Sequence, residues 1–227
     1  MQAKSALLNT KEYLINDVKP LEVTAVISEV QNRFNQLTYS HHPVIQDGLF
    51  LGSVSETDVH CFESDKTLED FKYVIEGFFV RETTNWLDIL EAFAQHHANI
   101  MPVLDKDNNY IGYYELGDIM NLFSETPFLH DAGGIAVVEK GITEYSFSEV
   151  AQIVESNDAR LLGLFISKME QDMVQITMKI APTDMNSIVQ TFRRYGYIVV
   201  SSHSEDSYIE ALRDRSEYLD KYLNMGL

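Results

Sequence analysis

The sequence lacks several features that define large classes of proteins. Its 227 residues contain a single cysteine, Cys61, so no disulfide can form within the chain. No uninterrupted run of 18 apolar residues occurs, which argues against a membrane-spanning helix. Residues 1–17 have too short and too interrupted an apolar stretch for a secretory signal. These absences favour a protein of the reducing cytoplasm.

Basic residues are scarce as well. The chain has 17 Lys and Arg residues against 35 Asp and Glu residues, which gives a formal net charge of −18. A surface this acidic repels a phosphate backbone, so we expect no nucleic-acid partner. An anionic small ligand would need local basic groups, helix N-termini or a divalent cation to offset the same field.

The motifs of common catalytic and metal sites are also missing. The chain has no G-x-S-x-G, no Walker loop and no G-x-G-x-x-G. The pairs His41-His42 and His96-His97 lack the spacing of zinc ligands, and we interpret them as surface or core histidines. Residues 105–109 resemble a calcium loop only superficially, because the EF-hand glycine and distal glutamate are absent. The sequence therefore predicts no enzyme and no metal site.

What the chain does contain is an internal repeat. The stretch Pro43–Asp58 returns as Pro102–Asp118, with an offset that changes from 59 to 60 residues in the turn. The two turns, residues 46–48 and 105–109, are rich in Asp, Asn and Gly, which tolerate the positive φ of a tight hairpin. A unit this small cannot bury its own sheet, so the two copies should pair.

Each copy has the same order of predicted elements. A short apolar strand precedes an amphipathic helix, a hairpin of two strands follows, and a second helix closes the copy. The predicted ranges are 21–23, 26–34, 43–45 and 49–54 in the first copy and 78–80, 86–93, 102–104 and 110–114 in the second, with closing helices that open at Asp58 and Asp118.

The last strand of the first copy runs into its closing helix through GSVSETD, residues 52–58, which has the form G-h-x-[ST]-x-x-D. With this motif and the repeat, residues 16–123 resemble a tandem pair of CBS domains, a Bateman module. The resemblance implies two βαββα repeats paired by a pseudo-twofold axis. It also implies that an adenosine-containing ligand, such as AMP, ADP, ATP or S-adenosylmethionine, binds in a cleft between the repeats.

The second copy departs from the motif at one position. GYYELGD, residues 112–118, keeps Gly112 and Asp118 but has Glu115 where the hydroxyl belongs. A carboxylate at that position would repel phosphate. The second cleft could therefore take adenosine without phosphate, take a cation, or be empty.

The resemblance implies particular ligand contacts. A carboxylate at Asp58 or Asp118 suits the two hydroxyls of a ribose, and the hydroxyl of Ser55 can reach phosphate; the alternative is that each Asp is simply a helix N-cap. The remaining candidates are the two motif glycines, apolar residues that could hold adenine and one basic residue that could face phosphate, with core packing or a solvated charge as the alternatives. They are Gly52, Gly112, Leu21, Val23, Val44, Phe79, Val80, Val103 and Arg81.

Residues 124–127 break the helical pattern, and the chain changes character after His130-Asp131, so we expect a domain boundary near residue 130. Residues 134–202 then alternate as strand, helix, strand, strand, helix and strand, which predicts a four-stranded antiparallel sheet with two helices on one face. This βαββαβ order is ferredoxin-like and resembles an ACT domain, a module that usually binds amino acids at a subunit interface. In the loop 140–146, Gly141 lies well before the helix, so the ligand site of that family does not transfer with the order of elements.

The predicted fold class is thus α+β, in five segments. They are a lead-in helix over 1–18, the first repeat over 19–62, a connector with the second repeat over 63–130, the ACT-like domain over 131–203 and a C-terminal helix over 204–227. This arrangement is similar to the acetoin-utilisation regulatory family of bacterial CBS–ACT proteins.

The resemblance implies a non-enzymatic, homodimeric regulator. An adenine nucleotide, with or without Mg²⁺, would act as its effector, and the ACT-like domain would carry the change to a partner subunit or target enzyme. No cofactor is required. Two alternatives stay open: a ligand-free interaction scaffold, and a divalent-cation sensor that uses the acidic clefts.

Overall fold

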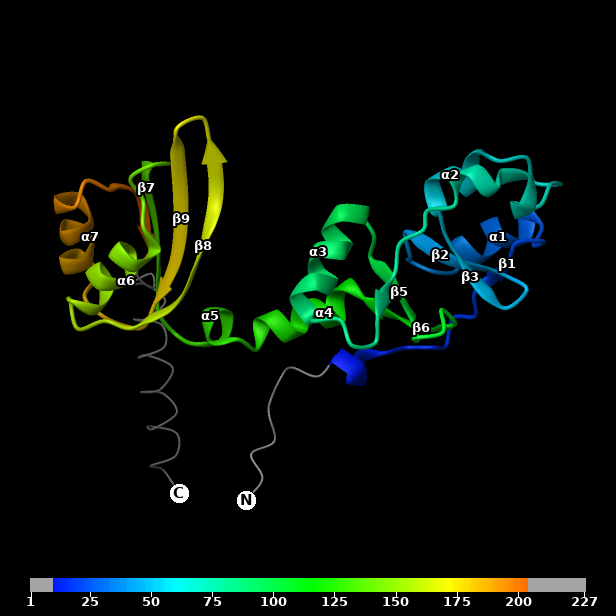
Figure 1. Cartoon of the computed structure of the whole chain (residues 1–227), viewed down its shortest axis with the longest axis horizontal. Helices are drawn as coiled ribbons and strands as arrows, with labels where there is room; N and C mark the ends of the chain where they lie inside the picture. Colours follow the sequence, from blue (N-terminus) through cyan, green and yellow to red (C-terminus); the bar gives the residue numbers. More distant parts are fainter. Residues whose placement is uncertain (1–9, 204–227) are drawn as a thin grey trace, which may run out of the picture. The chain divides into compact units, whose positions relative to one another are not determined.

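The computed structural model describes residues 10–203, which divide into two compact units between Ser124 and Glu125 (Figure 1). The predicted C-terminal helix and the first half of the predicted lead-in helix lie outside the described residues. The described half of the lead-in segment is not the predicted helix. Thr10–Tyr13 forms a single 3-10 turn, and Ile15 then pairs with Tyr113 through two backbone hydrogen bonds of 3.0 and 2.8 Å. Pairing with a strand of the second repeat has overridden the helical spacing of the apolar residues.

The first unit contains two βαββα repeats, as predicted, and the 3-10 segment Leu68–Val74 connects them. Each sheet has three strands, with one parallel pair and one antiparallel hairpin. The elements are β1 (Leu21–Glu22), α1 (Ile27–Phe34), β2 (His41–Gln46), β3 (Leu49–Ser55) and α2 (Glu56–Cys61), then β4 (Val80–Arg81), α3 (Trp86–His96), β5 (Ile100–Leu104), β6 (Tyr110–Glu115) and α4 (Leu116–Ser124).

The two hairpin turns account for the change of offset between the copies. Asp47 and Gly48 have φ values of 53° and 82°, as a tight turn requires. In the longer second turn, Asp105 Oδ1 accepts hydrogen bonds from the N–H groups of Asp107 and Asn109 at 2.8 and 2.9 Å. The acidic residue that resembled a calcium ligand therefore organises the turn itself.

Equivalent residues of the two repeats meet one another. Phe50 and Tyr110 occupy the same place in their hairpins, and their rings stack 6.4 Å apart at 11°. Ser40 and Asn99 are also equivalent: Ser40 N–H donates to Asn99 Oδ1 at 2.8 Å, and Asn99 N–H donates to Ser40 Oγ at 3.0 Å. Contact between equivalent residues is the mark of a pseudo-twofold axis, which confirms the predicted pairing.

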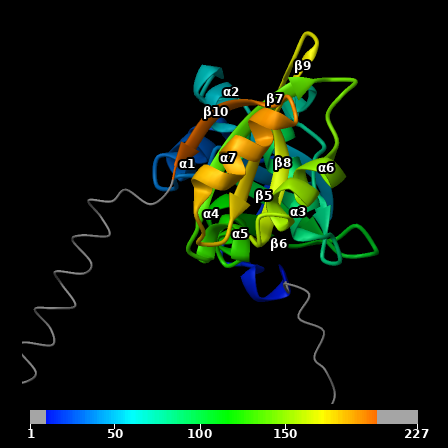
Figure 2. The same ribbon diagram turned by 90° about the vertical axis from the view of Figure 1, so that its left-hand side faces the viewer.

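The second unit is the predicted ferredoxin-like fold. Its sheet has the order β10-β7-β9-β8 with every neighbour antiparallel, and α6 and α7 cover one face (Figure 1 and Figure 2). Along β9, Val174, Ile176, Met178 and Ile180 are buried under the helices. The elements are α5 (Pro127–His130), β7 (Gly134–Gly141), α6 (Phe147–Glu155), β8 (Leu161–Glu170), β9 (Met173–Ile180), α7 (Met185–Arg194) and β10 (Ile198–His203).

The division between the units falls after Ser124, a few residues before the predicted boundary. The reason is α5, which packs on β8: the ring of Phe128 lies against Gly163 and meets Phe165 with centroids 5.6 Å apart. Among the described residues, no helix is both long and apolar enough to cross a membrane.

Candidate functional site

The Ser–Asp pair of the first motif lies where β3 ends. Ser55 is the N-cap of α2, and its Oγ accepts a hydrogen bond from Asp58 N–H at 3.1 Å and donates one to Asp58 Oδ2 at 2.7 Å. The prediction that the closing helices open at Asp58 and Asp118 is wrong, because each is the third residue of its helix. Ser55, rather than the carboxylate, is the cap of α2, so N-capping does not explain Asp58.

Gly52 allows the segment that precedes the second repeat to cross β3. A Cβ at this position would lie 2.6 Å from both Glu76 O and Ile75 Cγ2. Next to it, Ser53 and Glu76 pair through two backbone hydrogen bonds of 2.8 and 2.9 Å. The second repeat thus brings its leading segment close to the Ser–Asp pair of the first.

Three aromatic rings lie in the same neighbourhood. His41 is the cross-strand partner of Ser55, and its ring meets Phe78 edge-on with centroids 5.3 Å apart. Phe78 in turn stacks on His96 at 4.4 Å and 15°. Burial lowers the pKa of His41, and the nearby carboxylates of Glu76 and Asp58 oppose that shift.

We call these residues, which come from both repeats, the first cluster. Its members are His41, Ser53, Ser55, Asp58, Glu76, Phe78 and His96.

The second repeat holds different groups at the equivalent place. Tyr113 stands where the first repeat has Ser53, and its hydroxyl donates to Asp17 Oδ1 at 2.7 Å. The hydroxyl of Tyr39 donates to Glu115 Oε1 at 2.6 Å and lies 2.8 Å from that of Tyr113. Burial raises the pKa of both phenols. We call Asp17, Tyr39, Tyr113, Glu115 and Asp118 the second cluster.

Side chains of the second cluster form hydrogen bonds with one another. Glu115, which the sequence suggests would repel phosphate, accepts a hydrogen bond from Tyr39 of the first repeat. The side chain of Tyr113 is completely buried. At Gly112, a Cβ would collide with the carbonyl oxygen of Ile15, so the N-terminal segment crosses β6 just as residues 75–76 cross β3. The backbone of the two clusters is therefore equivalent, whereas their side chains are not.

Of the residues predicted to form an apolar slot for adenine, Phe79 is 40% exposed, and the other five belong to the cores of the two repeats. None of the five is more than 6% exposed: Leu21, Val23 and Val44 pack in the first core, and Val80 and Val103 pack in the second. Parallel pairing of β1 with β2 and of β4 with β5 places these side chains together under the helices of their own repeat. Core packing accounts for them, and we do not carry them into the proposed site.

Arg81 was considered a phosphate contact, but it lies at the far end of the second sheet. It pairs with Leu104, at the opposite end of β5 from Ile100, the partner of Glu115. Its guanidinium lies 4.9 Å from the centroid of the exposed Phe79 ring and donates to the second hairpin turn, at Asp105 O and Asn108 Oδ1. Arg81 therefore holds a turn and is placed away from Asp118.

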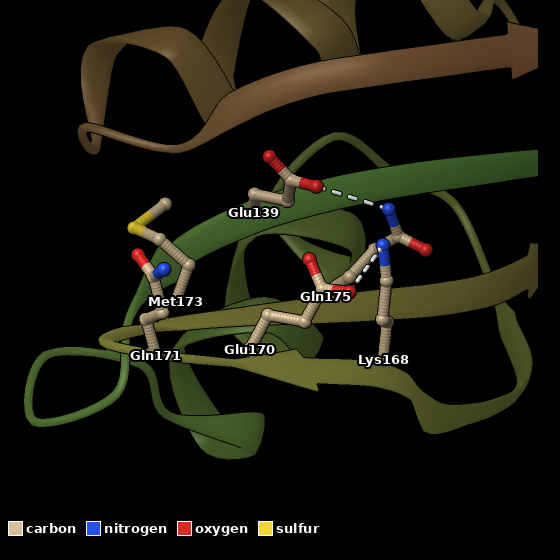
Figure 3. A pocket seen from close by; sticks show the side chains of 6 residues that line it. All are labelled: Glu139, Lys168, Glu170, Gln171, Met173 and Gln175. Atoms are coloured by element: carbon tan, nitrogen blue, oxygen red, sulfur yellow. Dashed lines mark hydrogen bonds and ion pairs between the residues drawn. The ribbon is translucent and has the colours of Figure 1, made fainter.

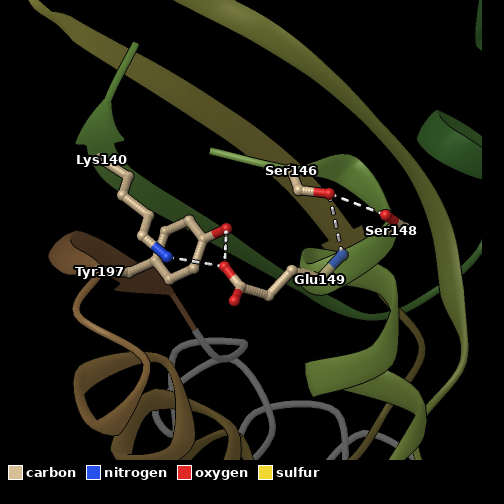
Figure 4. A network of polar contacts seen from close by, with 5 residues as sticks. All are labelled: Lys140, Ser146, Ser148, Glu149 and Tyr197. Atoms are coloured by element: carbon tan, nitrogen blue, oxygen red, sulfur yellow. Dashed lines mark hydrogen bonds and ion pairs between the residues drawn. The ribbon is translucent and has the colours of Figure 1, made fainter. Parts of the chain in front are cut away.

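In the second unit, a polar network joins β7, α6 and the segment before β10 (Figure 4). Lys140 Nζ lies 2.7 Å from Glu149 Oε2 and 4.3 Å from the centroid of the Tyr197 ring, and Tyr197 OH donates to the same oxygen at 2.8 Å. Hydrogen bonds from Lys140 and Tyr197 lower the pKa of Glu149. These groups satisfy one another across β7, α6 and the segment before β10, so the network serves the packing of the unit.

A small depression lies at the β8–β9 hairpin (Figure 3). It has a volume of about 270 Å³, and its polar groups pair with each other: Gln175 Nε2 donates to Glu139 Oε1 at 3.0 Å, and Lys168 Nζ lies 2.8 Å from Glu170 Oε1. Within residues 10–203, no group of three His, Cys, Asp or Glu side chains is arranged to hold a metal ion.

Comparison with known proteins finds one family match. Residues 72–125, which include the second repeat, match the family model of the CBS domain. No curated protein matches the chain.

Several solved structures of low sequence identity are similar to about half of the chain. A CBS domain pair/ACT domain protein from Thermotoga maritima is 24% identical with a TM-score of 0.47, over 52% of this chain and 98% of its own. The CBS domains of a transcriptional regulator from Streptococcus pneumoniae are 18% identical with a TM-score of 0.45, over 51% and 98%. CBSX2 in complex with AMP is 17% identical with a TM-score of 0.42, over 50% and 93%.

Sequence reasoning missed most of the two clusters. His41, Phe78 and His96 belong to no motif, and Tyr39 lies 74 and 76 residues from its partners in the second cluster. The repeat offset gives no signal for the crossing segments. Ser53 pairs with Glu76 and its equivalent Tyr113 pairs with Ile15, so the residue equivalent to Glu76 is Ile15, which does not follow the offset of 59 or 60 residues.

Proposed function

We propose that this chain is a non-enzymatic regulatory module that binds one adenosine-containing ligand, such as AMP, ADP, ATP or S-adenosylmethionine, at the first cluster. The observation that carries the proposal is the Ser55–Asp58 pair, a hydroxyl and a carboxylate 2.7 Å apart. An ionised carboxylate makes charge-assisted hydrogen bonds to the adjacent hydroxyls of a ribose, and a serine hydroxyl can donate to a phosphate oxygen.

The aromatic rings of the first cluster support the same ligand class. His96 is partly exposed and stacks on Phe78, so a purine base beside the Ser–Asp pair could pack against the His96 ring, whereas Phe78 and His41 are only 3% and 6% exposed. His41 comes from the first repeat, while Phe78 and His96 come from the second. A ligand bound here would contact both repeats at once.

Contact with both repeats provides a regulatory mechanism. A ligand that binds one relative orientation of the repeats more tightly shifts the population toward it, by as much as that preference. The ferredoxin-like unit follows directly in the chain after Ser124 and would convey the change to a partner subunit or a target enzyme.

A homodimer is part of this proposal. An apolar groove of about 700 Å³ lies between α3 and α4, where Met120 is 43% exposed. Exposed apolar surface on two adjacent helices favours association with a second copy. The lining residues include Leu90, Phe93, Ala94, Leu116, Met120 and Phe123.

A ligand-free scaffold is the second candidate function. The observation that favours it is the second cluster, in which the Tyr39 hydroxyl of one repeat donates a hydrogen bond to Glu115 of the other. A chain that uses one cluster to hold its repeats together could use both for that purpose.

Thermal unfolding separates the two candidates. We would measure the melting temperature with AMP, ADP, ATP, S-adenosylmethionine and NAD, each with and without Mg²⁺. A ligand at 100 times its dissociation constant adds about 2.7 kcal/mol to the free energy of unfolding. The proposal predicts stabilisation by at least one adenosyl compound that is lost in Asp58→Asn and kept in Asp118→Asn. A flat panel would favour the scaffold, and stabilisation by Mg²⁺ alone would favour a cation sensor.

A further inference from the structure

The first cluster holds two carboxylates, and both lie near His41. Asp58 belongs to the first turn of α2, and Glu76 belongs to the segment that crosses β3. Burial lowers the pKa of the His41 ring, and the negative charges of Glu76 and Asp58 oppose that shift. Since the pKa of His41 is below its ordinary value, the ring is uncharged at neutral pH. His41 therefore does not offset the two negative charges.

Basic side chains do not offset them either. Within residues 10–203, no Lys or Arg forms an ion pair with Asp58 or Glu76. Residues 10–124 contain seven Lys and Arg residues against 19 Asp and Glu residues. These basic residues bind elsewhere: Lys11, Lys66 and Lys72 pair with Glu82, Glu63 and Glu69, Arg33 donates to Lys19 O, and Arg81 holds the turn that contains Lys106. A phosphate group at the first cluster would meet like charge.

The hydrogen-bond donors at the start of α2 are already used. Ser55 Oγ donates to Asp58 Oδ2 at 2.7 Å, and Asp58 N–H donates to Ser55 Oγ at 3.1 Å. Glu56 N–H donates to Ser40 O at 2.9 Å. An ionised phosphate only accepts hydrogen bonds, so Ser55 would have to leave Asp58 in order to donate to it. The acceptors are different, because Asp58 Oδ1 and the exposed carboxylate of Glu76 make no hydrogen bond within the described residues.

A buried hydroxyl gives an independent indication of a ligand at this place. Ser53 is completely buried, and its Oγ has no hydrogen-bond partner within the described part of the chain. Ser53 and Ser55 are two residues apart on β3, so their side chains lie on the same face of the strand. A hydroxyl both donates and accepts, so an uncharged polar group of a ligand would satisfy it. The charge of the ligand is then selected by the two carboxylates.

We propose that, among adenosyl compounds, the first cluster prefers a ligand whose 5′ group is cationic over one whose 5′ group is a phosphate. This inference rests on the proposed function and specifies its ligand class. The ribose hydroxyls donate to Asp58, and a sulfonium or ammonium group at the 5′ position lies in the negative potential of Glu76. A phosphorylated ligand binds through its adenosine part and more weakly, because like charges oppose each other.

Calorimetric titration of the full-length chain at pH 7.5 tests this preference with four ligands that share adenosine. They are adenosine, AMP, S-adenosylhomocysteine and S-adenosylmethionine, of which the last two differ by one methyl group and one positive charge. We expect S-adenosylmethionine to bind at least about tenfold more tightly than S-adenosylhomocysteine, and AMP to bind more weakly than adenosine by a similar factor.

Two variants locate the origin of the preference. Glu76→Gln should reduce both differences to less than about threefold and leave the affinity for adenosine unchanged, because the side chain of Glu76 is exposed and only its charge is removed. Glu29→Gln is the matched control: Glu29 is an exposed residue of α1, and the change in net charge is the same. This variant should keep both differences.

Three outcomes would overturn the inference. AMP that binds as tightly as S-adenosylmethionine would show that the cluster does not select against phosphate, and the proposed function would stand. A preference for S-adenosylmethionine that is unchanged in Glu76→Gln, or equally reduced in Glu29→Gln, would show that Glu76 does not provide it. Binding of none of the four ligands would overturn the proposed function together with the inference.

Discussion

The two clusters of the CBS-like unit have equivalent backbone arrangements and different side chains. In both, a glycine of the hairpin strand lets the segment before the other repeat cross the sheet, with Gly52 beside Glu76 and Gly112 beside Ile15. Beyond that the first cluster has Ser53 and Ser55, whereas the second has Tyr113 and Glu115. The two places therefore have the same backbone framework and different side-chain chemistry.

The difference shows how one of two equivalent places can become structural. In the second cluster, the hydroxyls of Tyr39 and Tyr113 join carboxylates from the lead-in segment and from β6. Such a network rigidifies the contact between repeats when its members are satisfied. The first cluster keeps a small hydroxyl, Ser53 Oγ, which is buried and has no hydrogen-bond partner within the described part of the chain. The first cluster therefore has a polar side-chain group whose hydrogen bonds are not made by the described residues.

The largest expected effect tests the shared backbone. Gly52→Ala and Gly112→Ala each place a methyl group against a backbone carbonyl at a φ near +150°, so each should lower the free energy of unfolding by about 3 kcal/mol. Gly77→Ala, where an added Cβ meets nothing within 4 Å, is the control and should change it by less than about 0.5 kcal/mol. Urea unfolding measures all three. Destabilisation by only one of the pair would show that the repeats do not share this crossing.

A second prediction concerns a buried histidine that only the first repeat has. Burial lowers the pKa of His42 to about 4, while the equivalent Met101 has no titrating group. Protonation below the ordinary histidine pKa of about 6.5 therefore favours the unfolded state, and the loss of stability continues until about pH 4. Between pH 7.5 and pH 5, this residue should account for a loss of about 2 kcal/mol.

His42→Met, which makes the first repeat resemble the second, should remove that part of the pH dependence. Urea unfolding at the two pH values gives the slope for each protein. An unchanged slope would show that His42 does not contribute to acid destabilisation.

The third prediction sharpens the contrast between Tyr113 and Ser53. Tyr113→Phe removes the hydroxyl that joins Tyr39 to Asp17 and should cost about 1–2 kcal/mol of stability, because buried partners lose a hydrogen bond. Ser53→Ala removes a hydroxyl without a partner and should be neutral within about 0.5 kcal/mol, or slightly stabilising. Equal losses in the two variants would contradict the view that the hydroxyl at this position is hydrogen-bonded only in the second cluster.

The sequence predicted the fold well because the relevant signals are local. Asp-Gly at residues 47–48 and the Asp/Asn-rich turn at 105–109 located both hairpins, and the alternation along β9 located the face of the second sheet that its helices cover. The N-terminal segment was the exception. Its apolar spacing is helical, but pairing of Ile15 with Tyr113 decides its conformation, and that contact spans nearly a hundred residues.

The candidate site was predicted only as far as its motif extends. Ser55 and Asp58 lie together because they are three residues apart at a helix start. The rings of His41, Phe78 and His96 meet only after the repeats have paired, so no pattern in the chain indicates them. The sequence predicts a helix that opens at Asp58, whereas the backbone geometry shows that Ser55 is the N-cap.

The central claim is that one cluster of the pair binds the ligand and the other does not. Isothermal titration calorimetry of the full chain with AMP and with ATP, each with and without Mg²⁺, tests it most directly. We expect one site per chain, an affinity at least about tenfold weaker in Asp58→Asn because a charge-assisted bond is lost, and an unchanged affinity in Asp118→Asn. Two sites per chain, or an affinity that falls in Asp118→Asn and not in Asp58→Asn, would contradict the account.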